Sequence, residues 1–526
     1  MSSTHPTIEM NPEFERSLAL VRDGRSVFIT GRAGTGKSTL LGVIRKEIAM
    51  PMVVLAPTGV AALNVLGETI HAFCKFHPGV TEKDARAAGH KRHGDELIKK
   101  LRLVVIDEIS MVRADLLDHL DAFFRAALDS QESFGGKQIV MIGDCYQLPP
   151  VVKSDEEAYF GYKNGRPTHD SKARYDSPWF FSAKVISKIT SDLIELTKVY
   201  RQSDPAFIGL LNAVRNRTVD DTQLAHLNTR VWAGKETPEH ARGAITLTAT
   251  NAAADAINAA ELEKLSGKVR TYHGYVVGEF GDGRLPTDER LVLKKGARVM
   301  FLANDSRHRW VNGTLGTVAA ISHDGVDVRM DDGEVVAVEP FTWNVIRSTY
   351  SKRTRTIERE TIAEFTQFPL RLAWAVTIHK SQGLTFDRVF LDLGRGAFAH
   401  GQTYVALSRC RTFEGITLAR PVKASDVRMD WAVVKFLTSF QYAKSDAAMP
   451  LDQKIEKIQA AIRDGRKLRI VYLKRSDERS ERMITPREVG EMEYEDKPFF
   501  GLAAYCHERK DERVFRVDRI LEMEEV

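Results

Sequence analysis

Short apolar runs that end in polar or glycine-rich turns recur through the first part of the chain. They lie at residues 27–30, 51–56, 103–106 and 138–142. Strands that are buried on both faces of a parallel sheet have this continuous apolar pattern, because helices cover the sheet on each side. The pattern therefore predicts an α/β domain, preceded by a helix with Phe14, Leu18 and Val21 on one face.

A polar, turn-rich stretch at residues 152–176 predicts a long surface loop before a second α/β unit. That unit has apolar runs near 193–197, 244–249, 370–378 and 389–393, and an alanine-rich helical segment from 252 to about 265. Between the helical segment and the run at 370–378, Asn-Gly and Asp-Gly pairs separate short β-type runs, which is typical of hairpins. We read residues 305–365 as a small β-barrel inserted into the second α/β domain.

The last part of the chain has the pattern of a separate module. Residues 441–452 are predicted to be a linker, and Ile455, Ile458 and Ile462 mark one face of an amphipathic helix. Runs typical of β-strands follow this helix.

Composition limits the class of protein. The chain has 526 residues, 43% hydrophobic and 28% charged, which predicts several soluble globular domains. No uncharged apolar run approaches the ~20 residues that span a bilayer, and the polar start lacks a signal-peptide core. The four cysteines lack the spacing of a metal site and are expected to be reduced thiols. A net charge of +5 allows a polyanionic partner without indicating one.

A glycine-rich turn follows the first apolar run and precedes a helical segment. It reads Gly31-Arg-Ala-Gly-Thr-Gly-Lys37-Ser38. Backbone N–H groups of such a turn converge on phosphate oxygens, Lys37 can reach the β- and γ-phosphates, and the Ser38 hydroxyl can ligate Mg²⁺. The alternative is a chance glycine turn, but the strand–loop–helix context predicts a nucleoside-triphosphate site.

Polar side chains follow two further predicted strands. Asp107 and Glu108 follow one apolar run, where Asp107 can hold Mg²⁺ and Glu108 can deprotonate the attacking water; a solvated acidic turn is the alternative. Gln147 follows another run and can bind the γ-phosphate or that water. Arg201 and Arg409 lie in the second α/β unit, where each is either a surface salt bridge or an arginine that reaches across a cleft to the γ-phosphate.

Eight motifs in order resemble the petite-integration-frequency (PIF-type) DNA helicases, which are superfamily-one enzymes related to RecD. The motifs are the phosphate loop and the segments 56–62, 69–73, 107–111, 143–150, 200–202, 379–383 and 404–409. The resemblance implies an α/β fold with two RecA-like domains around ATP and an SH3-like insertion. It also implies ATP-driven 5′→3′ movement on single-stranded DNA with duplex unwinding, and leaves G-quadruplexes and RNA–DNA hybrids open as substrates.

The resemblance assigns roles to individual residues. The ATP and Mg²⁺ set is Gly31, Ala33, Gly34, Thr35, Gly36, Lys37, Ser38, Thr39, Asp107, Glu108, Gln147, Arg201, Arg409 and, in the loop coupling ATP to DNA, Gly383. The DNA track is Thr58, Gly59, His71, Phe73, Asn312, Gly313, Thr377, His379 and Lys380. The resemblance shifts the interpretation of His71 and Phe73 from loop packing to DNA contact. Phe14 stands where the family often has an adenine-reading glutamine, so adenine specificity is open.

The expected domains follow from the patterns and the resemblance together. They are a first RecA-like domain at 1–190 with a small insertion near 64–85, a second at 191–304 and 366–440, the SH3-like insertion at 305–365, and a tail at 453–526. The tail resembles a WYL domain, an Sm-like β-barrel, although the three-letter signature is not intact. Tyr472, Arg487, Arg513 and Arg516 are predicted to form its ligand or single-strand site, the alternative being a solvated strand face.

Two other functions compete with an ATP-dependent helicase. One is a translocase that strips proteins from DNA without separating its strands, and the other is a nucleotide-switched binding module acting through the tail. We expect a bacterial-type cytoplasmic, nucleoid-associated protein that binds single-stranded and tailed duplex DNA and no membrane. It is expected to be a monomer, with assembly on DNA left open.

Overall fold

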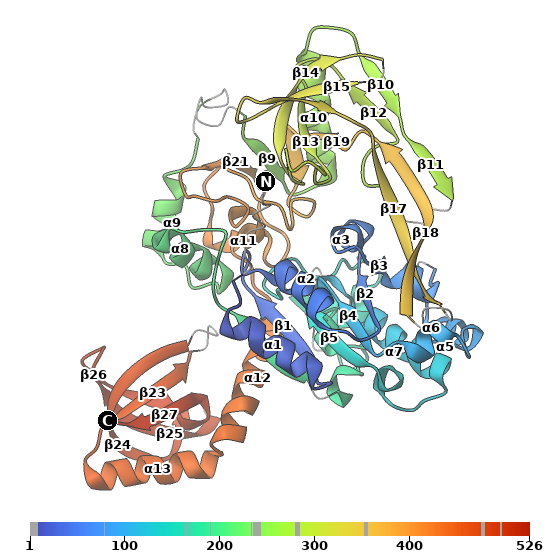
Figure 1. Ribbon diagram of the computed structural model, residues 1–526. Coiled ribbons are helices and arrows are strands. Elements are labelled where there is room, and N and C mark those ends of the chain that lie inside the picture. The colour runs from blue at the N-terminus through green and yellow to red at the C-terminus, as the bar shows by residue number, and fades with distance from the viewer. Residues whose placement is uncertain are drawn as a thin grey trace. The chain divides into compact units, whose positions relative to one another are not determined.

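The computed structural model describes residues 9–77, 79–163, 166–168, 170–189, 191–232, 234, 243–278, 285–323, 325–351, 356–474, 479–494 and 497–526. The chain forms two compact units (Figure 1). The first contains Met1–Asn212 and Asp220–Arg428, and the second contains Ala213–Val219 and Met429–Val526. No helix among the described residues has the length and apolarity that crossing a membrane requires.

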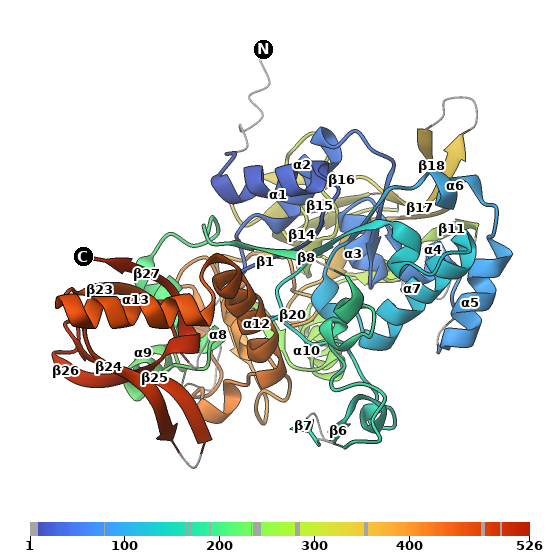
Figure 2. The same cartoon turned by 90° about the horizontal axis from the view of Figure 1, so that it is seen from below.

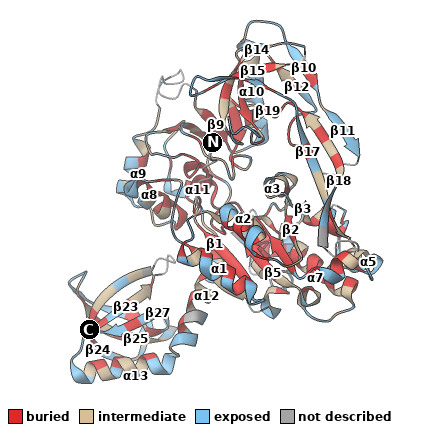
Figure 3. Cartoon of the chain, viewed as in Figure 1, coloured by how far each residue is buried: buried red, intermediate tan, exposed pale blue. Residues whose placement is uncertain are grey.

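A six-stranded parallel sheet forms the centre of the first domain in the first unit. Its order is β3-β2-β4-β5-β1-β8. The strands span Ser26–Gly31 (β1), Met52–Ala56 (β2), Glu68–Thr69 (β3), Leu103–Ile106 (β4), Gln138–Ile142 (β5) and Ser191–Leu196 (β8). The apolar runs predicted for this domain are therefore confirmed as buried strands, and Figure 3 shows this sheet as a band of buried residues. The predicted start of the second domain at residue 191 is wrong, because β8 pairs with β1 in this sheet.

Helices pack around this sheet, and their starts are fixed by capping side chains. Asn11 caps the first helix by accepting a 2.8 Å hydrogen bond from the amide of Phe14, and Thr58 and Thr69 cap the third and fourth. The helices span Pro12–Arg22 (α1), Lys37–Glu47 (α2), Gly59–Asn64 (α3), Ile70–Cys74 (α4), Glu82–Lys91 (α5), Glu96–Lys100 (α6) and Ala114–Leu128 (α7).

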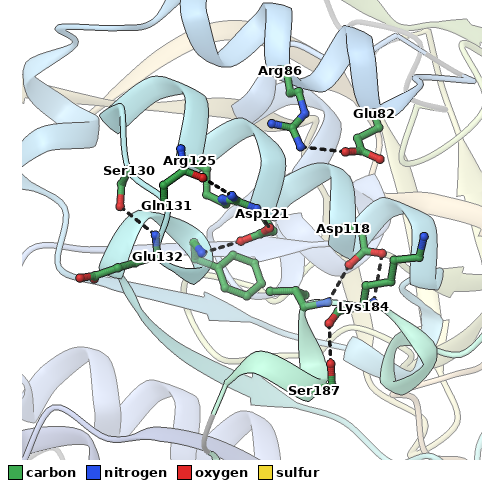
Figure 4. A network of polar contacts seen from close by, with 12 residues as sticks. Glu82, Arg86, Asp118, Asp121, Arg125, Ser130, Gln131, Glu132, Lys184 and Ser187 are labelled. Carbon is green, nitrogen blue, oxygen red and sulfur yellow. Dashed lines mark hydrogen bonds and ion pairs between the residues drawn. The ribbon is translucent and has the colours of Figure 1, made fainter.

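Carboxylates on α7 hold the segments around it, as Figure 4 shows. Asp118 accepts hydrogen bonds from the amides of Lys184 (3.1 Å) and Val185 (2.9 Å). Asp121 accepts one of 2.6 Å from the amide of Phe134. Asp118 and Asp121 therefore fix segments that have little regular structure.

The predicted polar loop at 152–176 includes two short strands, Tyr162–Lys163 (β6) and Arg166–Pro167 (β7).

The second domain is built on a four-stranded parallel sheet of order β20-β9-β21-β22. Its strands span Ile245–Thr248 (β9), Ala375–Thr377 (β20), Val389–Asp392 (β21) and Ile416–Leu418 (β22). The neighbouring helices span Pro205–Arg215 (α8), Asp221–Asn228 (α9), Asn251–Lys264 (α10) and Gln402–Leu407 (α11). The alanine-rich helix predicted from residue 252 is α10, capped by Thr250.

The β-rich insertion is larger than the predicted 305–365. Its antiparallel sheets have the orders β16-β15-β14-β13-β19, β10-β12 and β11-β18-β17. The strands span Arg270–His273 (β10), Tyr275–Gly278 (β11), Arg290–Leu293 (β12), Arg298–Phe301 (β13), Leu315–Ile321 (β14), Val326–Met330 (β15), Val335–Val338 (β16), Phe341–Ser351 (β17), Thr356–Gln367 (β18) and Leu370–Leu372 (β19). The prediction missed residues 270–301 because Asn-Gly and Asp-Gly turns mark only the hairpins. Tyr272, Leu291 and Val299 nevertheless lie in the same core as Val328.

The second unit packs two helices on a five-stranded antiparallel sheet of order β26-β25-β24-β23-β27. The helices are Trp431–Ala448 (α12) and Leu451–Asp464 (α13), and the strands are Leu468–Leu473 (β23), Arg479–Tyr494 (β24), Lys497–Cys506 (β25), Asp511–Arg516 (β26) and Ile520–Glu525 (β27). Figure 2 shows α13 lying over the sheet. The predicted face of Ile455, Ile458 and Ile462 is confirmed, since all three pack in the core of this unit.

The prediction that residues 441–452 form a linker is wrong. The α12 helix continues to Ala448, and α13 begins at Leu451. The Ser445 hydroxyl donates hydrogen bonds to the carbonyls of Ile520 (3.1 Å) and Leu521 (2.7 Å), and Lys454 forms a 3.2 Å ion pair with Asp446. These contacts make the end of α12 part of the folded tail. The polar composition of this segment is that of a helix surface.

Candidate nucleotide cleft and nucleic-acid track

The glycine-rich turn joins β1 to α2. Gly34 (φ +80°) and Gly36 (φ +87°) adopt left-handed backbone conformations that favour glycine. The Lys37 ammonium donates hydrogen bonds to the carbonyls of Gly31 (2.8 Å) and Arg32 (3.0 Å). No side chain caps the start of α2, so its first amides point into the turn without a side-chain acceptor. This arrangement is typical of a phosphate-binding loop, as the sequence predicted.

Asp107 and Glu108 follow β4 at the same edge of the sheet. Burial raises the pKa of the Asp107 carboxyl. Burial, followed by the neighbouring charge of Asp107, raises the pKa of Glu108 to about 7, while the Lys37 charge opposes the shift. Glu108 also has a left-handed φ of 48°, which is uncommon outside glycine and asparagine. A carboxyl group that titrates near neutral pH suits a general base.

Gln147 lies in the loop after β5 and is 6% exposed. Its side-chain amide donates a 3.1 Å hydrogen bond to Asp144 Oδ2, and its Oε1 accepts one of 3.1 Å from Gln382 Nε2. Gln382 belongs to the second domain, next to Gly383. Asp144 and Gln382 were missing from the predicted site. Their motif positions at strand ends were the available signal, but the contact between them and Gln147 depends on how the two domains pack.

Arg201 and Arg409 come from different parts of the chain. Arg201 follows β8 of the first domain and lies beside the phosphate loop, so the prediction that it belongs to the second α/β unit is wrong, whereas Arg409 follows α11 of the second domain. Arg409 is 1% exposed and donates to the carbonyls of Val405 (2.9 Å) and Leu384 (3.2 Å). Burial, followed by the charge of Arg201, lowers the pKa of Arg409 to about 9. Arg201 bonds the Ser408 carbonyl at 3.3 Å, and a Cβ added to Gly34 would lie 2.5 Å from Arg201 Cβ. The alternative role considered for Arg409, that of a partner in a surface salt bridge, does not fit, because this side chain is buried.

The remaining predicted nucleotide residues lie in or next to the loop. Thr35 Oγ1 donates a 2.9 Å hydrogen bond to the carbonyl of Arg32, and the amide of Ala33 donates one of 3.0 Å to the phenol oxygen of Tyr404. Ser38 and Thr39 lie in the first turn of α2. The Ser38 hydroxyl and the Asp107 carboxylate are hard oxygen donors of the type that Mg²⁺ prefers, so these residues fit that ion.

Phe14 packs under the phosphate loop. Its side chain is 2% exposed, and a Cβ added to Gly36 would lie 3.2 Å from its Cζ. This burial makes Phe14 part of the core of the first domain. This ring and the apolar face of α1 cover the same side of the sheet as α2.

Two segments of the predicted DNA track meet where the insertion faces the first domain. Asn312 Nδ2 donates a 3.4 Å hydrogen bond to Asn64 Oδ1, at the end of the helix that begins at Gly59. Gly313 has φ +94°, and a Cβ there would lie 3.2 Å from Leu384. The Asn312-Gly313 turn therefore lies near both α3 and the loop that carries Gly383. Thr58 is exposed at the start of α3.

The turn after β20 carries the third part of the predicted track. Thr377 is buried, and its hydroxyl accepts a 3.2 Å hydrogen bond from the amide of Lys380. Burial lowers the pKa of the half-buried His379. Lys380 is exposed. Gly383 follows with φ +82° and no atom within 4 Å of where a Cβ would lie. The buried Thr377 thus shapes a turn that presents Lys380.

The prediction that Phe73 stacks on DNA is wrong. Its ring is 3% exposed and packs against Phe123 (centroids 6.2 Å apart) and Phe124 (6.0 Å apart) on α7. Arg92 covers the ring at 5.4 Å. Phe73 therefore belongs to the core. His71 is half-buried on the same short helix, and burial lowers its pKa. Contact between His71 and DNA stays a prediction.

Of the four predicted tail residues, Tyr472 and Arg516 are in contact. The Tyr472 phenol oxygen lies 3.5 Å from the amide of Arg516, whose guanidinium bonds Asp518 at 2.7 Å and covers Phe499 at 5.4 Å. Arg487 and Arg513 are exposed and lie on the strands that flank β25. Arg487 forms a 3.7 Å ion pair with Glu512. Tyr472 and Arg516 thus form an aromatic and basic cluster.

Two parallel-sheet domains, a phosphate loop in one and a buried arginine, Arg409, in the other define a P-loop ATPase of RecA-like architecture. The PIF1-like helicase family matches residues 15–166. ATP-dependent DNA helicase Pif1 of Bdellovibrio bacteriovorus is 34% identical over 421 residues, which cover 78% of this chain and 88% of the relative. The chain belongs to the PIF1-like helicase family, and it is an ATP-dependent DNA helicase.

Other comparisons agree. Human ATP-dependent DNA helicase PIF1 is 34% identical over 459 residues, and the match spans 66% of its length. A crystal structure of Bacteroides Pif1 in complex with ADP-AlF4 is similar with a TM-score of 0.73 and 36% identity, covering 82% of this chain and 97% of that one. The WYL domain family matches residues 453–525. These matches confirm the predicted family, the two RecA-like domains and the WYL-like tail.

Proposed function

We propose that this helicase couples ATP hydrolysis in the cleft to 5′→3′ movement along single-stranded DNA and so unwinds duplexes. The observation that carries the proposal is the contact between the two domains at the phosphate loop, where Arg201 donates a 3.3 Å hydrogen bond to the carbonyl of Ser408, the residue before the buried Arg409. Hydrolysis then depends on how the two domains close, and closure moves the DNA track.

Each residue of the cleft has a separate role in ATP hydrolysis. Glu108 accepts a proton from water as the water oxygen bonds to the γ-phosphorus and the bond from that phosphorus to the β–γ bridging oxygen breaks, which leaves ADP and phosphate. Arg201 and Arg409 stabilise the charge on the transferring group, and Lys37 holds the β- and γ-phosphates. Gln147 bonds the γ-phosphate or the attacking water and so senses whether ATP or ADP is bound. Ser38 and Asp107 would hold Mg²⁺, which neutralises phosphate charge when it is bound.

The proposed track for single-stranded DNA runs over three turns that carry exposed or hydrogen-bonding groups. These are Thr58-Gly59, Asn312-Gly313 and the Thr377–Lys380 turn, with His71 beside them. Backbone amides, hydroxyls and Lys380 would contact phosphates without reading sequence. A Bacteroides Pif1 structure, 36% identical over 82% of this chain, is described as bound to ssDNA, which supports this assignment. Gly383 lies in the loop that would connect the track to the cleft.

We assign the tail a secondary role in binding an anionic ligand or a single strand. The support is the cluster of Tyr472 and Arg516 with Phe499, since aromatic rings stack on bases and arginine binds phosphate. Arg487 and Arg513 would extend this basic surface across β25. G-quadruplexes and RNA–DNA hybrids are further proposed substrates, and the proposed setting is a monomer at the bacterial nucleoid in the cytoplasm.

The experiment that tests the proposed function compares two duplexes of identical sequence, one with a 5′ and one with a 3′ single-stranded tail. ATP-dependent unwinding of only the 5′-tailed duplex is expected. Hydrolysis that single strands stimulate without any unwinding would favour a translocase. An absence of stimulated hydrolysis would favour a nucleotide-switched binding module.

A further inference from the structure

A short segment of the second domain, His400 to Tyr404, lies directly against two loops of the nucleotide site. Its N-terminal part contacts the loop after β5, and its C-terminal part contacts the phosphate loop. The segment includes the start of α11, the helix that leads to Arg409. The roles proposed above do not use these contacts.

The phenol of Tyr404 reaches the phosphate loop itself. The backbone amide of Ala33 donates a 3.0 Å hydrogen bond to the phenol oxygen, and both residues are buried, at 3% exposure for Tyr404 and 6% for Ala33. Ala33 lies between Arg32, whose carbonyl accepts from Lys37, and Gly34, whose carbonyl accepts from the amide of Tyr200. The phenol is therefore in a position to influence the shape of the loop that must hold the phosphates.

Gly401 and His400 hold the other loop. Gly401 has φ +67°, and a Cβ there would lie 2.3 Å from the carbonyl oxygen of Tyr146 and 2.6 Å from that of Gln147. A ring nitrogen of His400 donates a 2.9 Å hydrogen bond to the carbonyl of Cys145. The backbone of the second domain thus lies against the residue proposed to sense the γ-phosphate, at a distance that only glycine allows.

We propose that Tyr404 is a positioning residue for ATP hydrolysis, which holds the phosphate loop through Ala33 when the close contact at Gly401 brings the two domains together. The inference rests on the proposed function, because it assumes that closure of the cleft drives hydrolysis. Tyr404 acts through the backbone of the loop. Its loss is therefore expected to lower the rate of the closed, DNA-stimulated enzyme and to leave nucleotide binding to the first domain intact.

The test uses the full chain with Tyr404→Phe, which removes the phenol oxygen and keeps the ring. Two quantities are measured: kcat for ATP with saturating oligo(dT), and the Kd for a fluorescent ADP without DNA. We expect about a tenfold loss of stimulated kcat, the upper range for one hydrogen bond, with the Kd changed by less than about twofold. Tyr272→Phe is the control, because it removes a buried phenol that bonds Ser322 inside the β-rich insertion.

A second variant tests the same idea by steric means. Gly401→Ala places a Cβ against the Tyr146 and Gln147 carbonyls, so it is expected to lower stimulated kcat at least as much as Tyr404→Phe. Gly394→Ala is its matched control, since Gly394 also has a positive φ (+54°) but nothing within 4 Å of an added Cβ. Both variants strain the backbone, and only Gly401→Ala obstructs closure.

The possible results separate the inference from the proposed function. If single strands do not stimulate the natural chain, the proposed function fails. If they do, and Tyr404→Phe keeps its stimulated kcat within about twofold, the inference alone is overturned. Equal losses of kcat and ADP affinity would also overturn it, because they would show that the phenol only maintains the fold of the nucleotide site.

Discussion

Gln382 Nε2 donates a 3.1 Å hydrogen bond to Gln147 Oε1, and this bond joins the second RecA-like domain to the proposed γ-phosphate sensor of the first. Gln147 is bonded in turn to Asp144. Gln382 lies two residues after Lys380, in the predicted DNA track, so a single turn connects the track with the nucleotide site.

Gln382→Ala is expected to reduce the stimulation of ATP hydrolysis by single-stranded DNA and to affect basal hydrolysis less. The loss should be about 2- to 10-fold, as for one net hydrogen bond. A double-mutant cycle with Gln147→Ala, followed by stimulated kcat, measures the coupling between the two side chains. Strictly additive effects would show that the bond does not connect the track with the site.

Arg409→Ala is expected to lower stimulated kcat by about 10³-fold or more, because an arginine at the γ-phosphate stabilises transition-state charge. Arg395→Ala is the control, since Arg395 is an exposed arginine of the same domain. Steady-state hydrolysis with saturating oligo(dT) measures both. A variant at Arg409 that keeps near-normal turnover would contradict its assignment.

The titration of Glu108 predicts how activity depends on pH. A general base acts when it is deprotonated, and the pKa of Glu108 is about 7. Stimulated kcat should therefore rise with pH up to about 7, by close to tenfold per unit in the acidic range, and then level off. A profile that is flat between pH 5.5 and 8, at constant ionic strength, would contradict the role of Glu108 as the base.

Glu108→Gln should abolish turnover and change stability in a pH-dependent way. The folded pKa lies above the ordinary value of 4.5, so the native chain loses stability relative to the variant as pH rises from 4.5 towards 7. The variant should have a higher Tm than the native chain at pH 8 and a similar Tm at pH 5. Thermal unfolding at the two pH values measures this, and a difference that is larger at pH 5 would contradict the burial of the carboxyl group.

Substitutions at Phe73 and His71 are expected to affect different properties, stability in the first case and DNA binding in the second. Phe73→Leu is expected to lower stability by about 1 kcal/mol, because the ring lies in a packed core, and to leave the affinity of the folded protein for oligo(dT) unchanged. His71→Ala is expected to lower that affinity with a smaller effect on Tm. Fluorescence anisotropy at fixed salt and thermal unfolding measure the two properties. A selective loss of DNA affinity in Phe73→Leu would restore the stacking role.

Much of the site could be predicted because its residues follow strands. The apolar runs before Asp107, Gln147 and Gly31 mark strands of one parallel sheet, whose carboxyl ends share an edge. Periodicity and glycine positions are local properties of the sequence, so they located these groups. The identity of the family came from motif order, and the roles that this order assigns to Arg201 and Arg409 stay predictions.

The features that prediction missed depend on contacts between distant segments. Phe73 looked like a base-stacking residue until Phe123 and Phe124 on α7 were seen to enclose it. The bonds from Gln382 to Gln147 and from Ala33 to Tyr404 join residues more than 200 positions apart. No local pattern encodes such pairs. The polar stretch near Ser445 looked like a linker for the same reason, because its partners lie on β27.

We propose that closure of the cleft around ATP moves the chain in one direction along single-stranded DNA. The most direct measurement is unwinding of the matched 5′- and 3′-tailed duplexes, with ATP hydrolysis followed in the same reactions. We predict unwinding of the 5′-tailed duplex alone, with hydrolysis that Arg409→Ala abolishes together with unwinding. Unwinding from the 3′ tail, or unwinding that survives in Arg409→Ala, would contradict the account.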